Sequence, residues 1–347
     1  MKKRILSLLL VALFVSALLF ASGDAEKAKA ASASKPLSVM IWDSNQEPGI
    51  RKIIDDFTAK TGITAEIQVV DWNNYWTLLS AGAQGGSLPD VFWMHSNESQ
   101  RYMSNDLLLD VTDRIAKSAL IDPENYPEDI WSLYTYNKKY YAVPKDVDTI
   151  ALWYNRALFD QAGVAYPTDD WTWEDLYAAA KKITRADGSV YGFANVNSNN
   201  QAGWYNLIYG NNGYVLSEDK KKSGMDLPAT IEAMQWMEKM INENLMPPQA
   251  VMTESSEDVL LQSGKIAMTM QGSWMLPAFR DNEYTLKNCD IAMLPKNSKT
   301  GRRPSIYNGL GWAIAKNSPR TDDAWKLVEY FGSEEGQLKQ AQLGITM

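Results

Sequence analysis

Pro36-Leu-Ser-Val-Met-Ile-Trp42 opens the stretch that decides the fold, which ends at Asp90-Val-Phe-Trp-Met94. Both apolar runs predict short buried strands, and the alternating pattern from Ile63 to Val70 predicts another between them. Helical patterns separate these runs, at Pro48 to Thr61 and at Asn74 to Ala83. Strands and helices that alternate at this spacing are typical of a parallel α/β sheet with right-handed crossovers.

Polar side chains follow the first and third of these predicted strands. Asp43-Ser-Asn45 comes directly after one strand, and His95-Ser-Asn97 comes directly after the other. In open α/β sheets, ligands bind outside the carboxyl ends of the strands. We therefore expect four of these side chains to lie near a ligand: Asp43, Asn45, His95 and Asn97.

A second α/β region follows the strand-like segment near Pro144 to Asp148, which suits a hinge between two lobes. Thr172-Trp-Glu-Asp175 has the spacing of a capping box and predicts a helix that ends near Thr184. Leu227 to Asn244 predicts another helix, whose apolar face we interpret as core: Ile231, Met234, Met237 and Ile241. Further strands are predicted at Ile150 to Tyr154, Ile266 to Met270, Asp290 to Leu294 and Trp312 to Ala315.

Tryptophan is unusually frequent, with 13 residues against 8 phenylalanines. Five of them stand in polar or glycine-marked turns: Trp42, Trp93, Trp204, Trp274 and Trp312. Indole beside amides and carboxylates suits a ligand that has an apolar face and a polar rim, as a pyranose sugar has. The alternative for each of the five is ordinary packing. Four others lie on helix-like patterns and are assigned to packing: Trp72, Trp76, Trp131 and Trp236.

The first thirty residues have the pattern of an export signal. Lys2-Lys3-Arg4 precedes an apolar run from Ile5 to Phe20, and small residues follow it. The run is shorter than the ~20 residues that cross a bilayer. Asp24 stands after Gly23, where a lipid-bearing cysteine would be needed for an anchor. We expect residues 1–30 to be a signal peptide and leader, and the protein to be exported to the periplasm or cell surface without a lipid anchor.

The composition argues against several classes of site. The only cysteine is Cys289 and the only histidine is His95. The chain therefore lacks the second cysteine that an intramolecular disulfide needs and the several Cys and His ligands of the usual zinc sites. A net charge of −8 disfavours nucleic acid and anionic membrane as partners. We expect no cofactor and no metal.

A series of distinctive blocks runs along the chain in this order: Ser87-Leu-Pro-Asp-Val-Phe92, Pro144-Lys-Asp-Val-Asp-Thr-Ile-Ala-Leu-Trp-Tyr-Asn155, Trp171-Thr-Trp-Glu-Asp-Leu176, Gly264-Lys-Ile-Ala-Met268 with Gly272-Ser-Trp274, Gly309-Leu-Gly-Trp-Ala-Ile314, and Ala324-Trp-Lys-Leu-Val328 with Ser333-Glu-Glu-Gly-Gln337. In their residues and their order, these blocks resemble the bacterial extracellular solute-binding proteins of carbohydrate ABC importers, the family that includes maltose-binding protein.

The resemblance implies an α/β architecture of two lobes, the periplasmic-binding type II fold, with a hinge and an interlobe ligand cleft. The N-terminal lobe would comprise residues 36–146 and 289–347, and the C-terminal lobe residues 147–288. The chain would cross near 145–148 and return near 286–290. A mono- or oligosaccharide would bind in the cleft of a monomer, and closure would present a surface to the transmembrane subunits of an ABC permease.

The resemblance also implies roles for individual residues. Trp93, Trp274 and Trp204 would stack on sugar rings, with Trp312 as a further contact. Five polar side chains would bond hydroxyl groups: Asp43, Asn45, Asn97, Asp148 and Asn308. His95 is either a hydrogen-bond donor to the sugar or a satisfied loop histidine, and Asp146 is either a ligand contact or a turn-capping aspartate.

Two rival functions remain beside sugar import. A secreted glycoside hydrolase would also line a cleft with tryptophan and carboxylates, but no motif here pairs two carboxylates for that chemistry. A sugar sensor or adhesin could use the same fold without transport. Relatives continue for several more helices after the position of Gly344-Ile-Thr-Met347, so we interpret the chain as a family member without its carboxyl end. We expect binding without a reaction.

Overall fold

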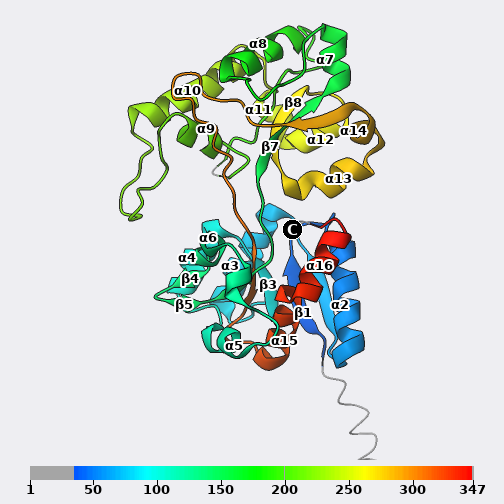
Figure 1. Cartoon of the computed structure of the whole chain (residues 1–347), viewed down its shortest axis with the longest axis vertical. Coiled ribbons are helices and arrows are strands. Elements are labelled where there is room, and N and C mark those ends of the chain that lie inside the picture. Colours follow the sequence, from blue (N-terminus) through cyan, green and yellow to red (C-terminus); the bar gives the residue numbers. More distant parts are fainter. Residues whose placement is uncertain (1–34, 199, 346–347) are drawn as a thin grey trace, which may run out of the picture.

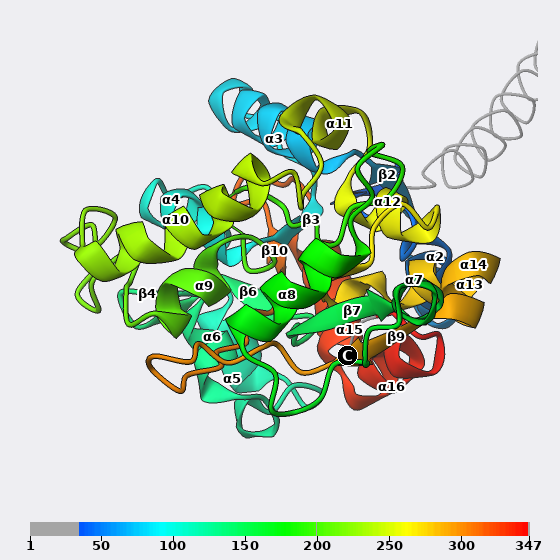
Figure 2. The same cartoon turned by 90° about the horizontal axis from the view of Figure 1, so that it is seen from above.

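Two α/β lobes lie one above the other along the longest axis of the molecule (Figure 1). The computed structural model describes residues 35–198 and 200–345. The predicted signal segment, residues 1–30, lies outside the described residues. None of the helices in the described ranges is long and apolar enough to cross a bilayer. Seen along the long axis, β7 and α8 of one lobe lie in front of β6 and α15 of the other (Figure 2).

Lobe 1 contains a five-stranded sheet in the order β2-β1-β3-β10-β6. Its strands are β1 (Leu37–Ile41), β2 (Ala65–Val69), β3 (Val91–Met94), β6 (Ala142–Pro144) and β10 (Gly311–Ile314). The first three are parallel, and β10 is antiparallel to both of its neighbours. The parallel sheet predicted from residues 36–94 is thus confirmed.

The helices of lobe 1 surround this sheet. They are α2 (Glu47–Thr61), α3 (Trp72–Gly85), α4 (Ser96–Ser104), α5 (Thr112–Lys117), η1 (Pro123–Asn125), α6 (Glu128–Ser132), α15 (Thr321–Gly332) and α16 (Glu334–Gln342), with a small hairpin of β4 (Thr135–Tyr136) and β5 (Lys139–Tyr140). The local sequence accounts for α2, which buries Ile50, Ile53, Ile54 and Phe57 on one face. It ends at Gly62, whose φ of 72° is a conformation that glycine adopts without steric cost.

Lobe 2 contains a three-stranded antiparallel sheet in the order β8-β7-β9. The strands are β7 (Ile150–Asn155), β8 (Met268–Gly272) and β9 (Cys289–Ala292). Its helices are α7 (Arg156–Ala162), α8 (Trp173–Ile183), α9 (Tyr205–Gly210), α10 (Pro228–Asn242), α11 (Gln249–Glu254), α12 (Glu257–Gln262), η2 (Ser273–Met275), α13 (Leu276–Asp281) and α14 (Glu283–Asn288). The capping box predicted for α8 is present between Thr172 and Asp175.

The buried face of α10 differs from the prediction. Its buried residues are Thr230, Ala233, Met237 and Met240. Ile231 is 44% exposed and Ile241 is 37% exposed, so the prediction is wrong for these two residues, whereas Met237 is buried and Met234 is partly buried against the core. Small residues at 230 and 233 let this side of the helix approach the lobe closely. A Cβ built on Gly213 would lie 2.5 Å from the Thr230 hydroxyl oxygen.

Two chain segments cross between the lobes. The first follows Pro144 and the second precedes Gly311, and they pair at Asp148 and Asn308. The backbone N–H of Asp148 donates to the carbonyl oxygen of Asn308 at 2.7 Å, and the reverse bond is 3.0 Å. Gly309 has no room for a side chain, because a Cβ there would lie 2.2 Å from the Asp146 carbonyl oxygen. The two segments are therefore in close backbone contact.

The second crossing lies later in the sequence than the resemblance implies. β9 pairs with β7, with Leu152 opposite Ala292 and Asn155 opposite Cys289. The Ser305 hydroxyl also bonds the backbone of Ile150. Residues 289–305 therefore belong to lobe 2, and both the return at 286–290 and the lobe boundary at 289 are wrong. The predicted strand at 290–294 exists, but its partner is the sheet of lobe 2.

Candidate ligand-binding site where the lobes meet

Two of the predicted ligand-contacting tryptophans lie in the core of lobe 1. Trp93 in β3 pairs with Trp312 in β10, and both are 0% exposed. Their ring centroids are 5.8 Å apart, and Trp312 stacks on Phe331 at 4.0 Å. Central strands of a sheet that is covered on both faces bury all their side chains. The predictions that Trp93 stacks on a sugar and that Trp312 contacts it are therefore wrong.

Two other indoles occupy the sheet edge where these were expected. Trp42 follows β1 and Trp72 begins α3, and both are partly exposed. Their centroids are 5.1 Å apart at an interplanar angle of 85°, and Trp72 lies 5.3 Å from the imidazole of His95. Trp72 lies on a helical pattern, which predicts packing, and that prediction is wrong for this partly exposed indole. Its position just after a parallel strand is the signal that could have identified it.

Both ring nitrogens of His95, at this edge of the sheet, have polar partners. It is 5% exposed and precedes α4, where its Nδ1 accepts the backbone N–H of Asn97 at 3.1 Å. Its Nε2 lies 3.1 Å from the side-chain amide of Asn308 on the second crossing. The side chain of Gln201, from lobe 2, approaches the imidazole and favours its protonated form. Burial lowers the pKa of His95 to about 4, although Asp146 and Gln201 act in the opposite direction. One residue thus links both lobes and a crossing segment.

Asp148, on the first crossing, joins lobe 2 in a similar way. Its side chain is buried, and its Oδ1 accepts the Ser273 hydroxyl at 3.1 Å. Burial and the nearby Asp146 raise the pKa of Asp148 well above its usual value, while Lys145 opposes them. Trp274, which follows Ser273 in the sequence, is partly exposed. Its indole packs against Gly272, where a Cβ would lie 1.9 Å from the ring. Asp148 therefore contacts the residue next to Trp274, so the predicted carboxylate and the predicted indole lie close together at lobe 2.

The predicted acids nearest to β1 are engaged by the protein itself. Asp43 accepts the backbone N–H of Asn45 and the side-chain amide of Gln46, both at 2.8 Å. The Gln46 amide oxygen accepts the Lys145 ammonium at 3.0 Å, and Lys145 pairs with Asp146 at 2.5 Å in a fully buried ion pair. Asp146 also accepts the backbone N–H of Leu310. Asp146 is thus a structural group, whereas the side chains of Asn45 and Asn97 are exposed.

Buried asparagine side chains hold the loop that carries Trp204 in place through hydrogen bonds. Asn195 donates to the carbonyl oxygen of Gly203 at 3.2 Å, and Asn206 donates to that of Gln201 at 2.6 Å. The side-chain oxygen of Asn206 accepts the backbone N–H of Ile306 at 2.8 Å. Trp204 itself is partly exposed. The Asn206 bond to Ile306 joins this loop to the second crossing. Neither Asn195 nor Asn206 is predicted from the sequence to hold the loop in place.

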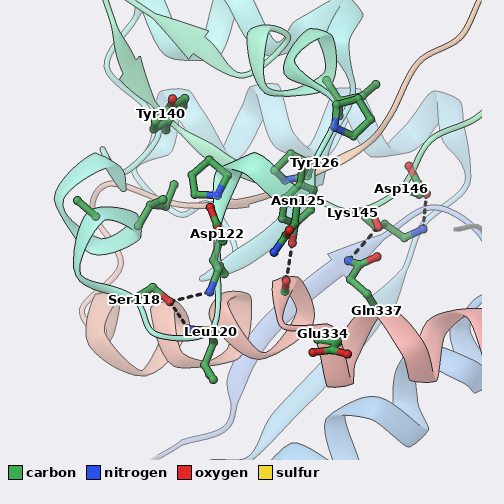
Figure 3. Close-up of a pocket in the computed structure, with 18 of the residues that line it drawn as sticks. Ser118, Leu120, Asp122, Asn125, Tyr126, Tyr140, Lys145, Asp146, Glu334 and Gln337 are labelled. Atoms are coloured by element: carbon green, nitrogen blue, oxygen red, sulfur yellow. Dashed lines mark hydrogen bonds and ion pairs between the residues drawn. The ribbon is translucent and has the colours of Figure 1, made fainter.

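A separate hollow lies on lobe 1, beside the first crossing (Figure 3). Its volume is about 1100 Å³, and none of the ten predicted site residues lines it. Protein groups already bond its polar side chains: the Ser118 hydroxyl accepts two backbone N–H groups, Tyr126 bonds the Gly332 carbonyl oxygen, and Gln337 bonds that of Lys145. Binding sites need polar groups left available to a ligand, so we place the candidate site at the interlobe residues instead.

Among the described residues, no group of three His, Cys, Asp or Glu side chains is arranged to hold a metal ion. Cys289 is partly buried, and burial raises the pKa of its thiol to about 12.

A model of the bacterial extracellular solute-binding protein family matches residues 43–338. The chain belongs to this family. Its members are binding proteins, so the expectation of a protein that binds without catalysis is confirmed, and the glycoside hydrolase alternative is not supported.

The family resemblance extends to individual proteins. The arabinooligosaccharide-binding protein of Bacillus subtilis is 25% identical over 341 residues, which cover 95% of this chain and 77% of the relative. An ABC substrate-binding protein from Listeria monocytogenes, solved with cycloalternan, superposes with a TM-score of 0.83 at 24% identity over 90% of this chain and 79% of the other. An ABC transporter-associated binding protein from B. animalis subsp. lactis, solved with β-1,6-galactobiose, gives 0.76 at 26% identity over 90% and 75%. The predicted two-lobed periplasmic-binding fold is thus confirmed.

Proposed function

We propose that this family member is the substrate-binding protein of a carbohydrate ABC importer, which holds a neutral mono- or oligosaccharide between its lobes and delivers it to a membrane permease. The observation that carries the proposal is the interlobe contact at His95, which joins lobe 1, the second crossing and lobe 2 beside the exposed indoles Trp42 and Trp72. The name of the Bacillus subtilis relative, an arabinooligosaccharide-binding protein, and the complex of the B. animalis subsp. lactis protein with β-1,6-galactobiose support the choice of ligand class.

The proposed contacts combine apolar and polar surfaces from both lobes. Trp42 and Trp72 of lobe 1, with Trp204 and Trp274 of lobe 2, provide the faces on which sugar rings stack. Asn45, Asn97, Asn308 and Asp148 provide hydrogen bonds to hydroxyl groups. Because the contacts come from both lobes, the sugar binds the closed form better than the open form and shifts the equilibrium towards closure. The permease then recognises the closed form.

Intrinsic fluorescence gives a direct test, because four of the proposed contacts are indoles. We expect titration with maltotriose, arabinotriose or β-1,6-galactobiose to change the tryptophan emission with a dissociation constant in the micromolar range, equivalent to about −8 kcal/mol. The sugar that binds should also raise the melting temperature. Absence of both responses for a broad panel of mono- and oligosaccharides contradicts a carbohydrate-binding role.

Two further assays separate the rivals. Recovery of the bound oligosaccharide with its glycosidic bonds intact supports binding, whereas hydrolysis products would support the glycoside hydrolase. Uptake of the same sugar by cells that express the chain with its permease distinguishes an importer from a sensor. Export to the periplasm or cell surface is part of the proposal, and the amino terminus of the secreted protein should lie after the predicted signal.

A further inference from the structure

The two nitrogens of His95 have different partners, and this fixes where its proton lies. Nδ1 is 3.1 Å from the backbone nitrogen of Asn97, which always carries hydrogen. Nδ1 must therefore accept, and it has no proton. A neutral imidazole then carries its single proton on Nε2. The pKa of about 4 keeps the ring neutral at physiological pH.

The tautomer determines which atom of Asn308 faces the ring. Nε2–H can only donate, so the Asn308 amide atom 3.1 Å away must be an oxygen, and any contact of the Gln201 side chain with this nitrogen must also be made through its oxygen. The oxygen and nitrogen of an asparagine amide exchange places by a half-turn about the last side-chain bond, with no change in shape. The arrangement that satisfies both residues places the oxygen against His95 and turns the NH2 group away from it.

The outer atom of the Asn308 amide is free to meet a ligand. The described residues offer it no hydrogen bond, and it is not among the buried side-chain atoms that lack a partner, so it retains access to solvent. The backbone of Asn308 is held to Asp148 by two hydrogen bonds. The amide is thus anchored at the point where the two segments cross between the lobes.

We infer that His95 is a positioning residue: its Nε2–H holds the Asn308 amide so that the NH2 group faces the interlobe site and donates to an acceptor oxygen of the bound sugar. The inference rests on the proposed function and assigns a polarity to one position in the site. A sugar that places a hydroxyl or ring oxygen opposite Asn308 is selected. An analogue that lacks this oxygen leaves the donors without a partner, which costs affinity.

The tautomer itself is measurable without any ligand, because the chain contains one histidine. The experiment is a long-range ¹H–¹⁵N correlation spectrum of the ¹⁵N-labelled protein, purified without a histidine tag. We expect a single imidazole with the pattern of the Nε2–H tautomer, unchanged between about pH 7.5 and pH 5.5, since the ring stays neutral well above its pKa. The Nδ1–H pattern, or an average over both tautomers, overturns the inference.

The donor role is tested by Asn308→Asp and Asn308→Ala, titrated with β-1,6-galactobiose, arabinotriose and maltotriose. Aspartate retains an oxygen for Nε2–H but has no N–H, so we expect at least tenfold weaker binding of whichever of these sugars binds the unmodified protein. Asn308→Ala should show a similar loss without an added charge. Asn105→Asp, at an exposed site on lobe 1, is the matched charge control and should bind as the unmodified protein does.

The outcomes separate this inference from the proposed function. Unchanged affinity in both Asn308 variants overturns the donor role. If one variant does not fold, the other variant and the spectrum of the unmodified protein still decide. If the Nε2–H tautomer is found but no sugar of the broad mono- and oligosaccharide panel binds the unmodified protein, the proposed function is contradicted, and the positioning of Asn308 by His95 stands on the spectrum.

Discussion

The tryptophans inside the strands of lobe 1 are buried, whereas those at the carboxyl edge of the same sheet are partly exposed to solvent. Trp93 and Trp312 pair across β3 and β10 and are completely buried. Trp42 and Trp72 lie one residue beyond β1 and three beyond β2, and both remain partly exposed. The residue type is the same in all four cases. Whether an indole lies within a strand or just beyond its end decides whether it stabilises the lobe or is available to a ligand.

The most stringent test of this comparison is Trp93→Ala. Loss of a fully buried indole, which also lies beneath the Lys145 ammonium at 4.9 Å, should lower the free energy of unfolding of lobe 1 by about 3–5 kcal/mol. Urea denaturation measures this loss, and because each lobe has its own core, only the transition of lobe 1 should shift. Trp42→Ala is the matched control and should cost clearly less. An equal cost in the two variants would remove the distinction between core and edge.

A second test concerns His95, whose ring centroid lies 6.4 Å from that of Trp42 and 5.3 Å from that of Trp72. Its pKa is about 4 in the folded protein, against about 6.5 in an unfolded chain. Below pH 6.5 the unfolded chain takes up a proton that the folded protein does not, so the folded state loses relative stability. This loss continues until the pH reaches about 4, and it amounts to about 3 kcal/mol.

The measurement compares the protein with His95→Asn, which has no titrating ring. The stability of the unmodified protein relative to the variant should fall by about 3 kcal/mol from pH 7 to pH 4. Asp148 has the opposite sign, because its raised pKa makes the folded state bind a proton that the unfolded chain releases. It is present in both proteins, so the difference isolates the imidazole. A difference that does not change with pH contradicts the burial of His95.

Much of the architecture could be predicted from the sequence because it depends on local patterns. The strands and helices of residues 36–94 follow from apolar periodicity, and the capping box of α8 follows from Thr172 and Asp175. The face of α10 could not be predicted in the same way. Two adjacent stripes on that helix differ by one residue in phase, and the stripe that is fully buried includes Thr230 and Ala233 in addition to two methionines.

The candidate site was less predictable, for a physical reason. Its location at the ends of β1 and β3 follows from the parallel sheet, and His95 lies there. Whether Trp93 or Trp72 is exposed depends on which strand lies in the middle of the sheet, and that is set by the antiparallel insertion of β10 beside β3. This pairing joins residues more than 200 positions apart, so no local pattern reveals it. The prediction of the second crossing is wrong for the same reason, because the pairing of β9 with β7 also joins segments that are far apart in the sequence.

The smallest expected effect, in free energy, is the loss of an edge indole. Trp72→Ala and Trp274→Ala should each weaken binding of the sugar found in the titrations by at least tenfold, about 1.4 kcal/mol, because each removes a stacking face from one lobe. Trp236→Ala is the matched control. Trp236 is also partly exposed in lobe 2, but it packs against Trp173 at 5.3 Å, so its loss should leave the dissociation constant within about twofold. Unchanged affinity in both Trp72→Ala and Trp274→Ala would mean that exposure at the sheet edge does not mark the ligand-binding indoles, and the comparison with Trp93 would then concern stability alone.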